Sequence, residues 1–192
     1  MTVQNTIEEM MIQSEAYLKG HFLLSSGKHS GHYMQCAMML RCPDKAAFAG
    51  QAIAQALEGI AVDFVVSPAI GGLIIGHEVA RGLGVPFLFC ERENGAMTLR
   101  RFPVEPNQRF VVVEDVITTG GSAAEVGEHL RERGCIWEAT ACIVDRSGGA
   151  HRFDNDPISL WATSFPVYAP SNCPLCDQGK PLCKPGSRPG DR

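Results

Sequence analysis

The sequence predicts an α/β protein with a central, mostly parallel β-sheet flanked by helices. Short runs of apolar and β-branched residues alternate along the chain with longer amphipathic stretches, and two of these runs end in Gly-rich turns that open a helix. Such an alternation builds a parallel sheet through right-handed crossover connections. A chain of 192 residues is long enough to bury one core of this kind. We therefore expect a single domain over residues 1–192.

The first half of the chain alternates helix and strand signals. A helix is expected over about residues 5–19, leading to Gly20, and strand-like pieces over 22–40 are broken at Ser26-Gly27-Lys28. Asp44 is a helix-capping residue type and is expected to start an Ala-rich helix that runs to about Leu57. The expected strand Phe64–Ser67 and a turn at Pro68–Gly72 then lead into a helix that ends near Gly82.

The second half continues the same pattern. The expected elements are a strand at Val85–Cys90, a polar irregular loop at 91–108, a strand from Phe110, a helix that stops at Gly134, and strands at Ala139–Asp145 and Ile158–Thr163. Ala123, Val126 and Leu130 share one face of that helix. After Pro166 the chain is rich in Pro, Gly and Cys, and we call residues 166–192 the tail.

The segment Phe110–Ser122, FVVVEDVITTGGS, is the most informative about function. Its first four residues are β-branched or aromatic and indicate a buried parallel strand, so the residues that follow lie where open α/β sheets bind ligands. Thr118 to Ser122 then enter a helix and present backbone N–H groups, hydroxyls and the positive helix end to one point. Such a point suits a phosphate.

Glu114 and Asp115 stand between this strand and the turn. Two carboxylates can each accept hydrogen bonds from a vicinal diol, so the segment is typical of a ribose 5-phosphate site. A lone Gly-Gly pair would more often be an ordinary turn with solvated carboxylates, but here the ordered combination favours the site. The Walker A pattern and the dinucleotide fingerprint are both absent from the sequence.

A second strand end, Ser67-Pro68-Ala69-Ile70-Gly71-Gly72, also leads into a helix through small residues. Adjacent glycines let backbone amides approach a charged ligand closely, so a second anion can bind there. Taken alone, this segment would more often be a structural turn.

Several segments together resemble a known family. EDVITTGGS resembles the phosphoribosyl pyrophosphate (PRPP) motif of type I phosphoribosyltransferases. SPAIGGLIIG at 67–76, ERENGAMTLRRF at 91–102, VDRSGG at 144–149 and the tail segments CPLC and KPGSR, in this order, resemble bacterial orotate phosphoribosyltransferases over nearly the whole chain. The resemblance implies the type I phosphoribosyltransferase fold, with an N-terminal hood at about residues 1–40.

The resemblance implies roles for individual residues. The residues implied to bind PRPP are Ala69, Ile70, Gly71, Gly72, Arg92, Glu114, Asp115, Val116, Ile117, Thr118, Thr119, Gly120, Gly121 and Ser122. Those implied to bind orotate are Thr118, Arg146 and, as a stacking residue in the hood, Tyr33. Glu114, Asp115 and Arg92 are the implied catalytic residues. Mg²⁺ is the implied cofactor, carried mainly by PRPP rather than by a protein cage.

The loop at 91–108 is implied to be mobile and to reach the site of a neighbouring subunit, which makes a homodimer the expected assembly. It departs from the enterobacterial and yeast pattern, because it contains neither Lys nor His. The resemblance implies that Arg92 is a PRPP ligand. For Arg100 and Arg101 two interpretations remain: they replace the missing lysines, or they belong to a solvated surface loop. Ser25 stands where the enterobacterial enzymes have a lysine, and Lys28 is a candidate substitute.

The composition of the chain limits which partners and which cellular location we expect. A net charge of −4 without Lys/Arg runs argues against nucleic acid and anionic membranes as partners. No basic leader or apolar stretch of about 20 residues is present, so we expect a cytoplasmic protein. Cys36, Cys42, Cys90, Cys135 and Cys142 are then expected to be buried free thiols.

The tail carries Cys173, Cys176 and Cys183, a spacing that resembles half of a zinc site. A closed zinc site needs four ligands, so no metal site is predicted unless another side chain joins them. The alternative is a tight loop of reduced thiols packed on the domain. His29 and His32 are interpreted as surface residues.

Two other functions are weighed against orotate transfer. One is a phosphoribosyltransferase for another base, against which Arg146 argues because a purine has no carboxylate to pair with it. The other is a PRPP-sensing regulator without turnover, favoured by the lysine-free loop but opposed by the absence of a recognisable DNA-binding module.

Overall fold

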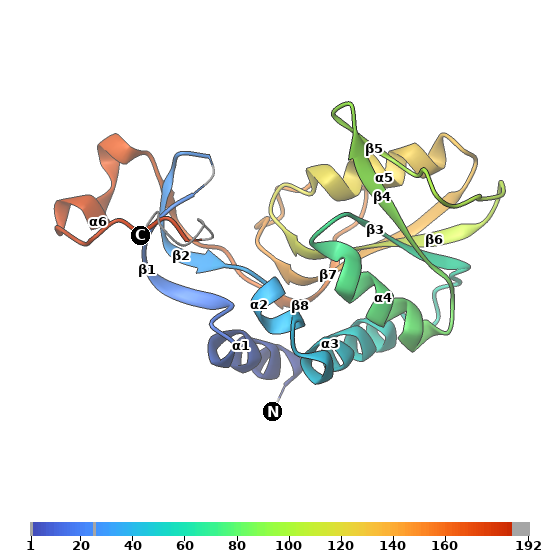
Figure 1. Cartoon of the computed structure of the whole chain (residues 1–192), viewed down its shortest axis with the longest axis horizontal. Coiled ribbons are helices and arrows are strands. Elements are labelled where there is room, and N and C mark those ends of the chain that lie inside the picture. The colour runs from blue at the N-terminus through green and yellow to red at the C-terminus, as the bar shows by residue number, and fades with distance from the viewer. Residues whose placement is uncertain (1, 25, 186–192) are drawn as a thin grey trace.

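The computed structural model describes residues 2–24 and 26–185, and its main feature is a six-stranded sheet in the order β5-β4-β3-β6-β7-β8 (Figure 1). Its strands are β3 Phe64–Pro68, β4 Phe87–Glu93, β5 Ala96–Thr98, β6 Arg109–Ile117, β7 Ile136–Asp145 and β8 Ile158–Ala162. All neighbouring strands pair in parallel except β4 and β5. The expected α/β class with a mostly parallel sheet is therefore confirmed.

Helices cover both faces of this sheet. They are α1 Val3–Gln13, α2 Ala37–Leu40, α3 Pro43–Ala56, α4 Gly72–Leu83 and α5 Gly121–Arg131, with a short α6 Pro174–Asp177 in the tail. Helices α1 to α4 pack on one face, whereas α5 packs on the other (Figure 1).

The alternation of side chains along buried strands supplies the two cores. Val65, Val111 and Val113 belong to the cluster on the face of α3 and α4. Phe110 and Val112, next to them in sequence, belong to the cluster that includes α5. Because successive side chains point to opposite faces, a continuously apolar strand indicates a sheet covered on both sides, as observed.

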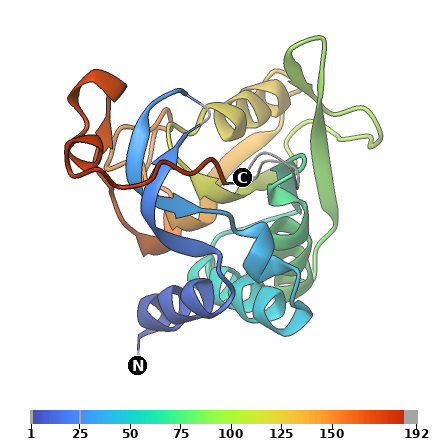
Figure 2. The same ribbon diagram turned by 60° about the vertical axis from the view of Figure 1, so that its left-hand side comes forward.

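A second, three-stranded sheet lies beside the main one and joins the two ends of the chain. This hood sheet has the antiparallel order β1-β2-β9, formed by β1 Tyr17–Leu23, β2 His29–Met34 and β9 Val167–Tyr168. Two views show the tail running along these strands (Figures 1 and 2). Within the tail, the backbone of Cys183 forms an isolated β-bridge with that of Phe22. The tail from residue 186 onward lies outside the described residues.

The helix expected over residues 5–19 is wrong at its end. It stops at Gln13 with Ser14 as cap, and Tyr17 already begins a strand. Tyr17 is buried against Trp161 and Phe165, so tertiary packing overrides the local helical pattern.

Four smaller expectations are also corrected. The irregular loop at 91–108 contains a β-hairpin, since β5 pairs with β4 across Asn94-Gly95, both at positive φ. Asp44 lies in the first turn of α3 rather than at its cap, because Pro43 takes the first helical position. Residues 37–40 are helical. His29 is buried rather than exposed at the surface.

Four of the five cysteines expected to be buried free thiols are so, and Cys42 is partly exposed. Within the described residues, no helix combines the length and apolar character that crossing a membrane requires.

The contact between α3 and α4 depends on a glycine. A methyl group at Gly50 would lie 2.4 Å from Glu78 Cβ and 2.7 Å from the Glu78 carbonyl carbon. We predict that Gly50→Ala lowers the free energy of unfolding by about 1–3 kcal/mol in urea titrations, because the helices must separate. Gln51→Ala, at the exposed neighbouring position, is the control, and equal stability of the two variants would contradict the prediction.

Candidate functional site

The carboxyl end of β6 and the start of α5 form a cavity of about 240 Å³. Gly120 caps α5 in a left-handed conformation with φ of 71°, which lets the chain turn sharply from strand to helix. The residues that line the cavity are Glu114, Val116, Ile117, Thr118, Thr119, Gly120, Gly121, Ser122, Ala123 and Glu125. The turn predicted to bind phosphate therefore does enclose a space at a helix N-terminus.

Glu114 and Asp115 lie within β6 rather than after it. The strand continues to Ile117 because Val116 and Ile117 still pair with β7. The Val116 N–H donates to Asp115 Oδ1 at 2.8 Å, and the Asp115 N–H donates to Glu114 Oε1 at 3.3 Å. The rigid sheet, rather than a loop, thus positions both carboxylates.

The second glycine-rich turn meets this acidic pair. A methyl group at Gly71 would lie 2.8 Å from Asp115 Oδ1, and one at Gly72 would lie 3.2 Å from Glu114 Oε1. Any larger residue would displace a carboxylate, so the close approach requires both glycines. Ile70 at the tip of this turn is 84% exposed. The two turns predicted from separate sequence segments therefore both lie against the same acidic pair.

The pKa values of the Glu114 and Asp115 carboxyl groups are raised. Burial, followed by the charge of Asp115, raises the pKa of Glu114, and burial raises the pKa of Asp115. Neither group forms an ion pair within the described part of the chain. A ligand that brings hydroxyl donors or a cation would favour the ionised forms.

Arg92 lies at the rim of the phosphate cavity. Its Nη1 is 3.0 Å from Oε2 of Glu125, which lines the cavity, and the same guanidinium donates to the Gly95 carbonyl oxygen. Both side chains are 44% exposed, so the pair can open to admit an anion at small cost.

Arg100 and Arg101 point elsewhere in this conformation. Arg101 Nε lies 2.7 Å from Glu91 Oε2, and this hydrogen-bonded ion pair raises the pKa of Arg101 and lowers that of Glu91. Arg100 Nε lies 3.5 Å from Glu93 Oε2. Both arginines are exposed on the β4–β5 hairpin side of the sheet and belong to neither cavity of the site.

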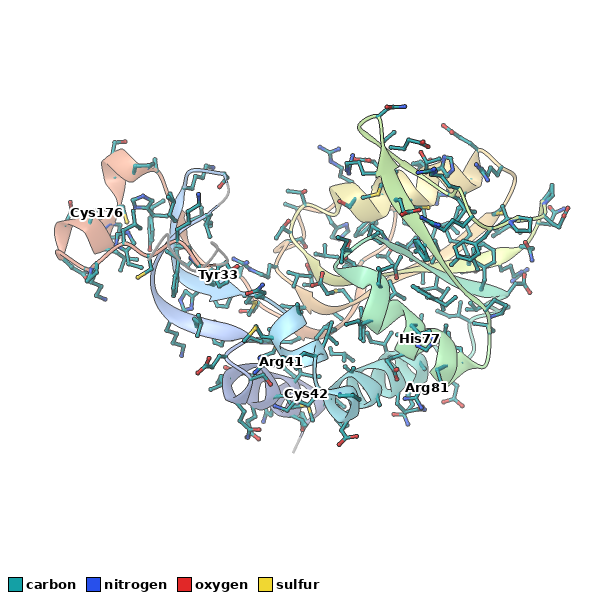
Figure 3. The ribbon with its side chains drawn as sticks, viewed as in Figure 1. Tyr33, Arg41, Cys42, His77, Arg81 and Cys176 are labelled. Carbon is teal, nitrogen blue, oxygen red and sulfur yellow. The ribbon has the colours of Figure 1, made fainter. Side chains whose placement is uncertain are left out.

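A larger cavity of about 640 Å³ adjoins the first and separates the hood sheet from the end of β7. Thr118 and Thr119 line both cavities. The remaining walls are Leu23, Leu24, Ser26, Lys28, Tyr33, Met34, Arg146, Phe165, Val167, Lys184 and Pro185. The structure thus brings together Thr118, Arg146 and Tyr33, the three residues expected to contact the base; Figure 3 shows Tyr33 on the hood sheet.

Arg146 stands out in this second cavity. Its Nε is buried and has no hydrogen-bond partner among the described residues, and burial lowers the pKa of Arg146. The guanidinium lies over the Phe165 ring at 5.3 Å. A buried arginine donor left without an acceptor is costly, so the position favours an anionic or carbonyl-bearing ligand.

The lining residues that sequence reasoning missed include Phe165, Val167, Lys184 and Glu125. The first three come from the tail and its approach, more than 120 positions from the hood residues they face, and no local pattern links the two segments. Glu125 is one turn along α5 from Gly121, so helical spacing from the phosphate turn was the available signal.

The comparisons with known proteins agree with this geometry. The family model "Phosphoribosyl transferase domain" matches residues 43–167. An orotate phosphoribosyltransferase of Thermotoga maritima is 48% identical over 183 residues, covering 95% of this chain and 98% of the relative. One of Pelotomaculum thermopropionicum is 49% identical over 174 residues, covering 90% and 92%. The crystal structure of orotate phosphoribosyltransferase from Aeropyrum pernix superposes with a TM-score of 0.70 at 27% identity, covering 81% of this chain and 93% of that one.

The phosphate turn provides a matched pair of glycines. Gly120→Ala should lower the free energy of unfolding by about 1–3 kcal/mol, because a left-handed φ strains alanine and the methyl would lie 2.5 Å from Phe153 Cζ. Gly121→Ala, whose nearest neighbour would be 3.7 Å away, should change it by less than about 1 kcal/mol. Chemical denaturation of both variants checks this, and equal losses would refute the assigned role of Gly120.

The acidic pair predicts a pH dependence of stability. Because the folded state keeps a proton on Glu114 above the ordinary carboxyl pKa of about 4.3, it binds more protons than the unfolded state. The free energy of unfolding of the unliganded protein should therefore fall as pH rises above that value. Urea titrations from about pH 5 to about pH 8 should show a shallower fall for Glu114→Gln. The exposed Glu58→Gln should keep the wild-type slope, and a Glu114→Gln slope equal to wild type would contradict the prediction.

Proposed function

The chain belongs to the orotate phosphoribosyltransferases of the phosphoribosyltransferase family, and on that premise we propose how its site transfers the 5-phosphoribosyl group of PRPP to orotate. It is a pentosyltransferase, and the reaction yields orotidine 5′-monophosphate and pyrophosphate in pyrimidine synthesis. The observation that carries the proposal is that a phosphate cavity and a base cavity share Thr118 and Thr119, with a buried, unpaired arginine Nε in the base cavity among the described residues.

We propose one orientation for PRPP, which would extend from the first cavity to the turn at Ala69–Gly72. Its 5-phosphate would accept hydrogen bonds from the backbone N–H groups and hydroxyls of Thr118–Ser122 at the start of α5. The ribose hydroxyls would donate to Glu114 and Asp115. The pyrophosphate would then lie at Ala69–Gly72, next to the acidic pair, with Arg92 available from the rim.

Orotate fits the second cavity. Arg146 offers a planar donor fork for its carboxylate, and Tyr33 offers an aromatic face for its ring. Phe165, which holds the Arg146 guanidinium from one side, limits the arginine to few orientations. Thr118, shared by both cavities, would stand where the ring nitrogen meets the ribose carbon.

The chemistry needs positioning and charge stabilisation more than proton transfer. The bond from ribose C1 to the pyrophosphate oxygen breaks, and its electron pair leaves with pyrophosphate. Orotate N1 forms the new bond to C1, and the proton that N1 gives up ends on the released pyrophosphate. Ionised Glu114 and Asp115 lie near the ribose and stabilise the positive charge that develops on it. Arg92 stabilises the departing anion. The two cavities fix donor and acceptor at one contact point, which removes much of the entropic cost.

The donor set at the site fits magnesium. Glu114 and Asp115 offer carboxylate oxygens, the ligand type that Mg²⁺ prefers, and neither is paired with a cation in the described residues. We propose that the ion is carried mainly by PRPP and meets the protein at these two groups. When bound, Mg²⁺ would neutralise pyrophosphate charge.

The proposal extends to the setting of the protein. We propose one phosphoribosyltransferase domain with appended hood and tail, a homodimer in which the segment 91–108 serves the neighbouring site, and a cytoplasmic location. Nucleic acid and membranes are not proposed as partners, in keeping with the net charge of −4.

Arg146 is the residue that tests the choice of base. We predict that Arg146→Ala lowers kcat/KM for orotate by about 10²–10³-fold, the loss expected for a charged hydrogen-bonded pair. PRPP affinity should stay within about threefold of wild type, because the phosphate cavity does not include Arg146. The loss of orotate ultraviolet absorbance with PRPP and Mg²⁺ measures turnover, and calorimetry measures PRPP binding.

The exposed Arg152→Ala is the matched control and should behave as wild type. Parallel reactions with uracil, adenine and hypoxanthine should show little turnover. Wild-type turnover of orotate by Arg146→Ala would overturn the assignment of this residue, and turnover of another base in preference to orotate would overturn the proposed substrate.

A further inference from the structure

Four potential metal ligands gather where the tail meets the hood sheet, outside both cavities of the site. They are His21 of β1, His29 of β2, Cys173 at the cap of α6 and Cys176 within α6. One ligand atom from each lies within 4.8 Å of all the others. Figure 3 shows Cys176 in the tail helix beside the hood strands. His21, His29 and Cys173 are buried.

The distances match a tetrahedral ion better than a hydrogen-bond network. His21 Nε2 lies 3.0 Å from His29 Nδ1, 3.5 Å from Cys173 Sγ and 3.7 Å from Cys176 Sγ, and Cys176 Sγ lies 3.4 Å from His29 Nδ1. Zinc bond lengths of about 2.0–2.1 Å to nitrogen and about 2.3 Å to sulfur place ligand atoms about 3.3 Å (N to N) and about 3.6 Å (N to S) apart around a tetrahedron.

A further contact fixes the tautomer of His21. Its Nδ1 lies 2.9 Å from the Lys180 carbonyl oxygen, and since a carbonyl can only accept, Nδ1 carries the proton. In the neutral imidazole, Nε2 is then unprotonated and presents a single lone pair to three close neighbours. One lone pair can accept only one good hydrogen bond, so it cannot satisfy three neighbours at once. A metal ion placed between the four ligand atoms would use this lone pair and one from each neighbour. A backbone carbonyl behind a ligating histidine is the usual outer contact of a zinc site.

We propose that His21, His29, Cys173 and Cys176 form a closed structural zinc site that fastens the tail to the hood sheet. Two thiolates and two imidazoles in tetrahedral arrangement favour zinc over magnesium or calcium, which prefer oxygen ligands. The Cys-Pro-Leu-Cys spacing supplies one half of the set, and the paired strands β1 and β2 supply the other.

The place of the site in the fold explains its use. Among the described residues, neither hydrophobic cluster includes a member of α6 or of the segment from Leu18 to Tyr33. A segment that buries little apolar surface needs another source of stability, and a structural metal supplies it. The Cys183 side chain is not part of the set, although its backbone pairs with His21 and Leu23.

Zinc content of tag-free protein tests the proposal. Wild type purified without chelator, or apoprotein given zinc, should hold about one zinc ion per chain by mass spectrometry, and cobalt substitution should give the absorption bands of a tetrahedral thiolate site. Cys173→Ser and Cys176→Ser should hold less than about a tenth of an ion. Cys183→Ser, an exposed cysteine of the same tail, should keep the full content.

Two results would overturn the proposal: wild type that takes up neither zinc nor cobalt, or a Cys183→Ser loss equal to that of Cys176→Ser. A Cys173–Cys176 disulfide in freshly reduced and re-purified protein, seen as two missing thiols, would also overturn it. If a serine variant fails to fold, wild type alone decides, because zinc removal by chelator should lower its melting temperature and added zinc should restore it.

A functional consequence follows that rests on the proposed orotate transfer. The hood sheet and tail supply Lys28, Tyr33 and Lys184 to the base cavity, so zinc removal should raise KM for orotate more than KM for PRPP. Zinc content does not depend on turnover, so a protein that binds zinc but does not use orotate would refute the function and leave the site intact.

Discussion

The parallel pairing of β3 with β6 determines the geometry of the site, because it ends two neighbouring strands at the same edge of the sheet. Phe64, Val65 and Val66 pair in register with Phe110, Val111 and Val112. Each strand continues into a glycine-rich turn and a helix, so the turns at Ala69–Gly72 and Thr118–Ser122 must lie side by side. Two helix N-termini and two sets of backbone amides then lie next to each other, which is the arrangement that the proposed binding of the pyrophosphate and the 5-phosphate of one PRPP molecule would use.

The same register sets the electrostatics. β6 runs past the end of β3, so Glu114 and Asp115, near its carboxyl end, stand between the turns with no cation paired to them in the described residues. Burial raises the pKa of both carboxyl groups. A ligand with diol donors and a divalent ion would favour the ionised forms, and in the proposed reaction these two charges would stabilise the ribosyl cation.

Local patterns predicted the parts of the structure that depend on local physics. The buried strand from Phe110, the apolar face of Ala123, Val126 and Leu130, and both phosphate turns were predictable because hydrophobic period, helix starts and glycine position are written in consecutive residues. The strand at Tyr17 was not, since its burial depends on Trp161 and Phe165 from the far end of the chain. For the same reason, the phosphate cavity could be predicted almost completely, whereas half of the base cavity could not.

The residues proposed to select the base lie largely on the hood sheet and the tail, which are the parts of the fold that contribute least to the hydrophobic cores. Residues that would face the phosphate belong to the main sheet and its helices, which possess two cores. Residues that would face the base come largely from the hood sheet and the tail, which contribute little to either core. The cavity proposed for the base is thus walled largely by strands outside the main cores, and these strands still need a defined register. Three contacts hold the hood sheet at one end: its pairing with β9, the backbone β-bridge between Phe22 and Cys183, and the side-chain contact between His21 and Cys173. These contacts give the hood strands a defined register, while the wall beside Tyr33 stays outside the two hydrophobic clusters.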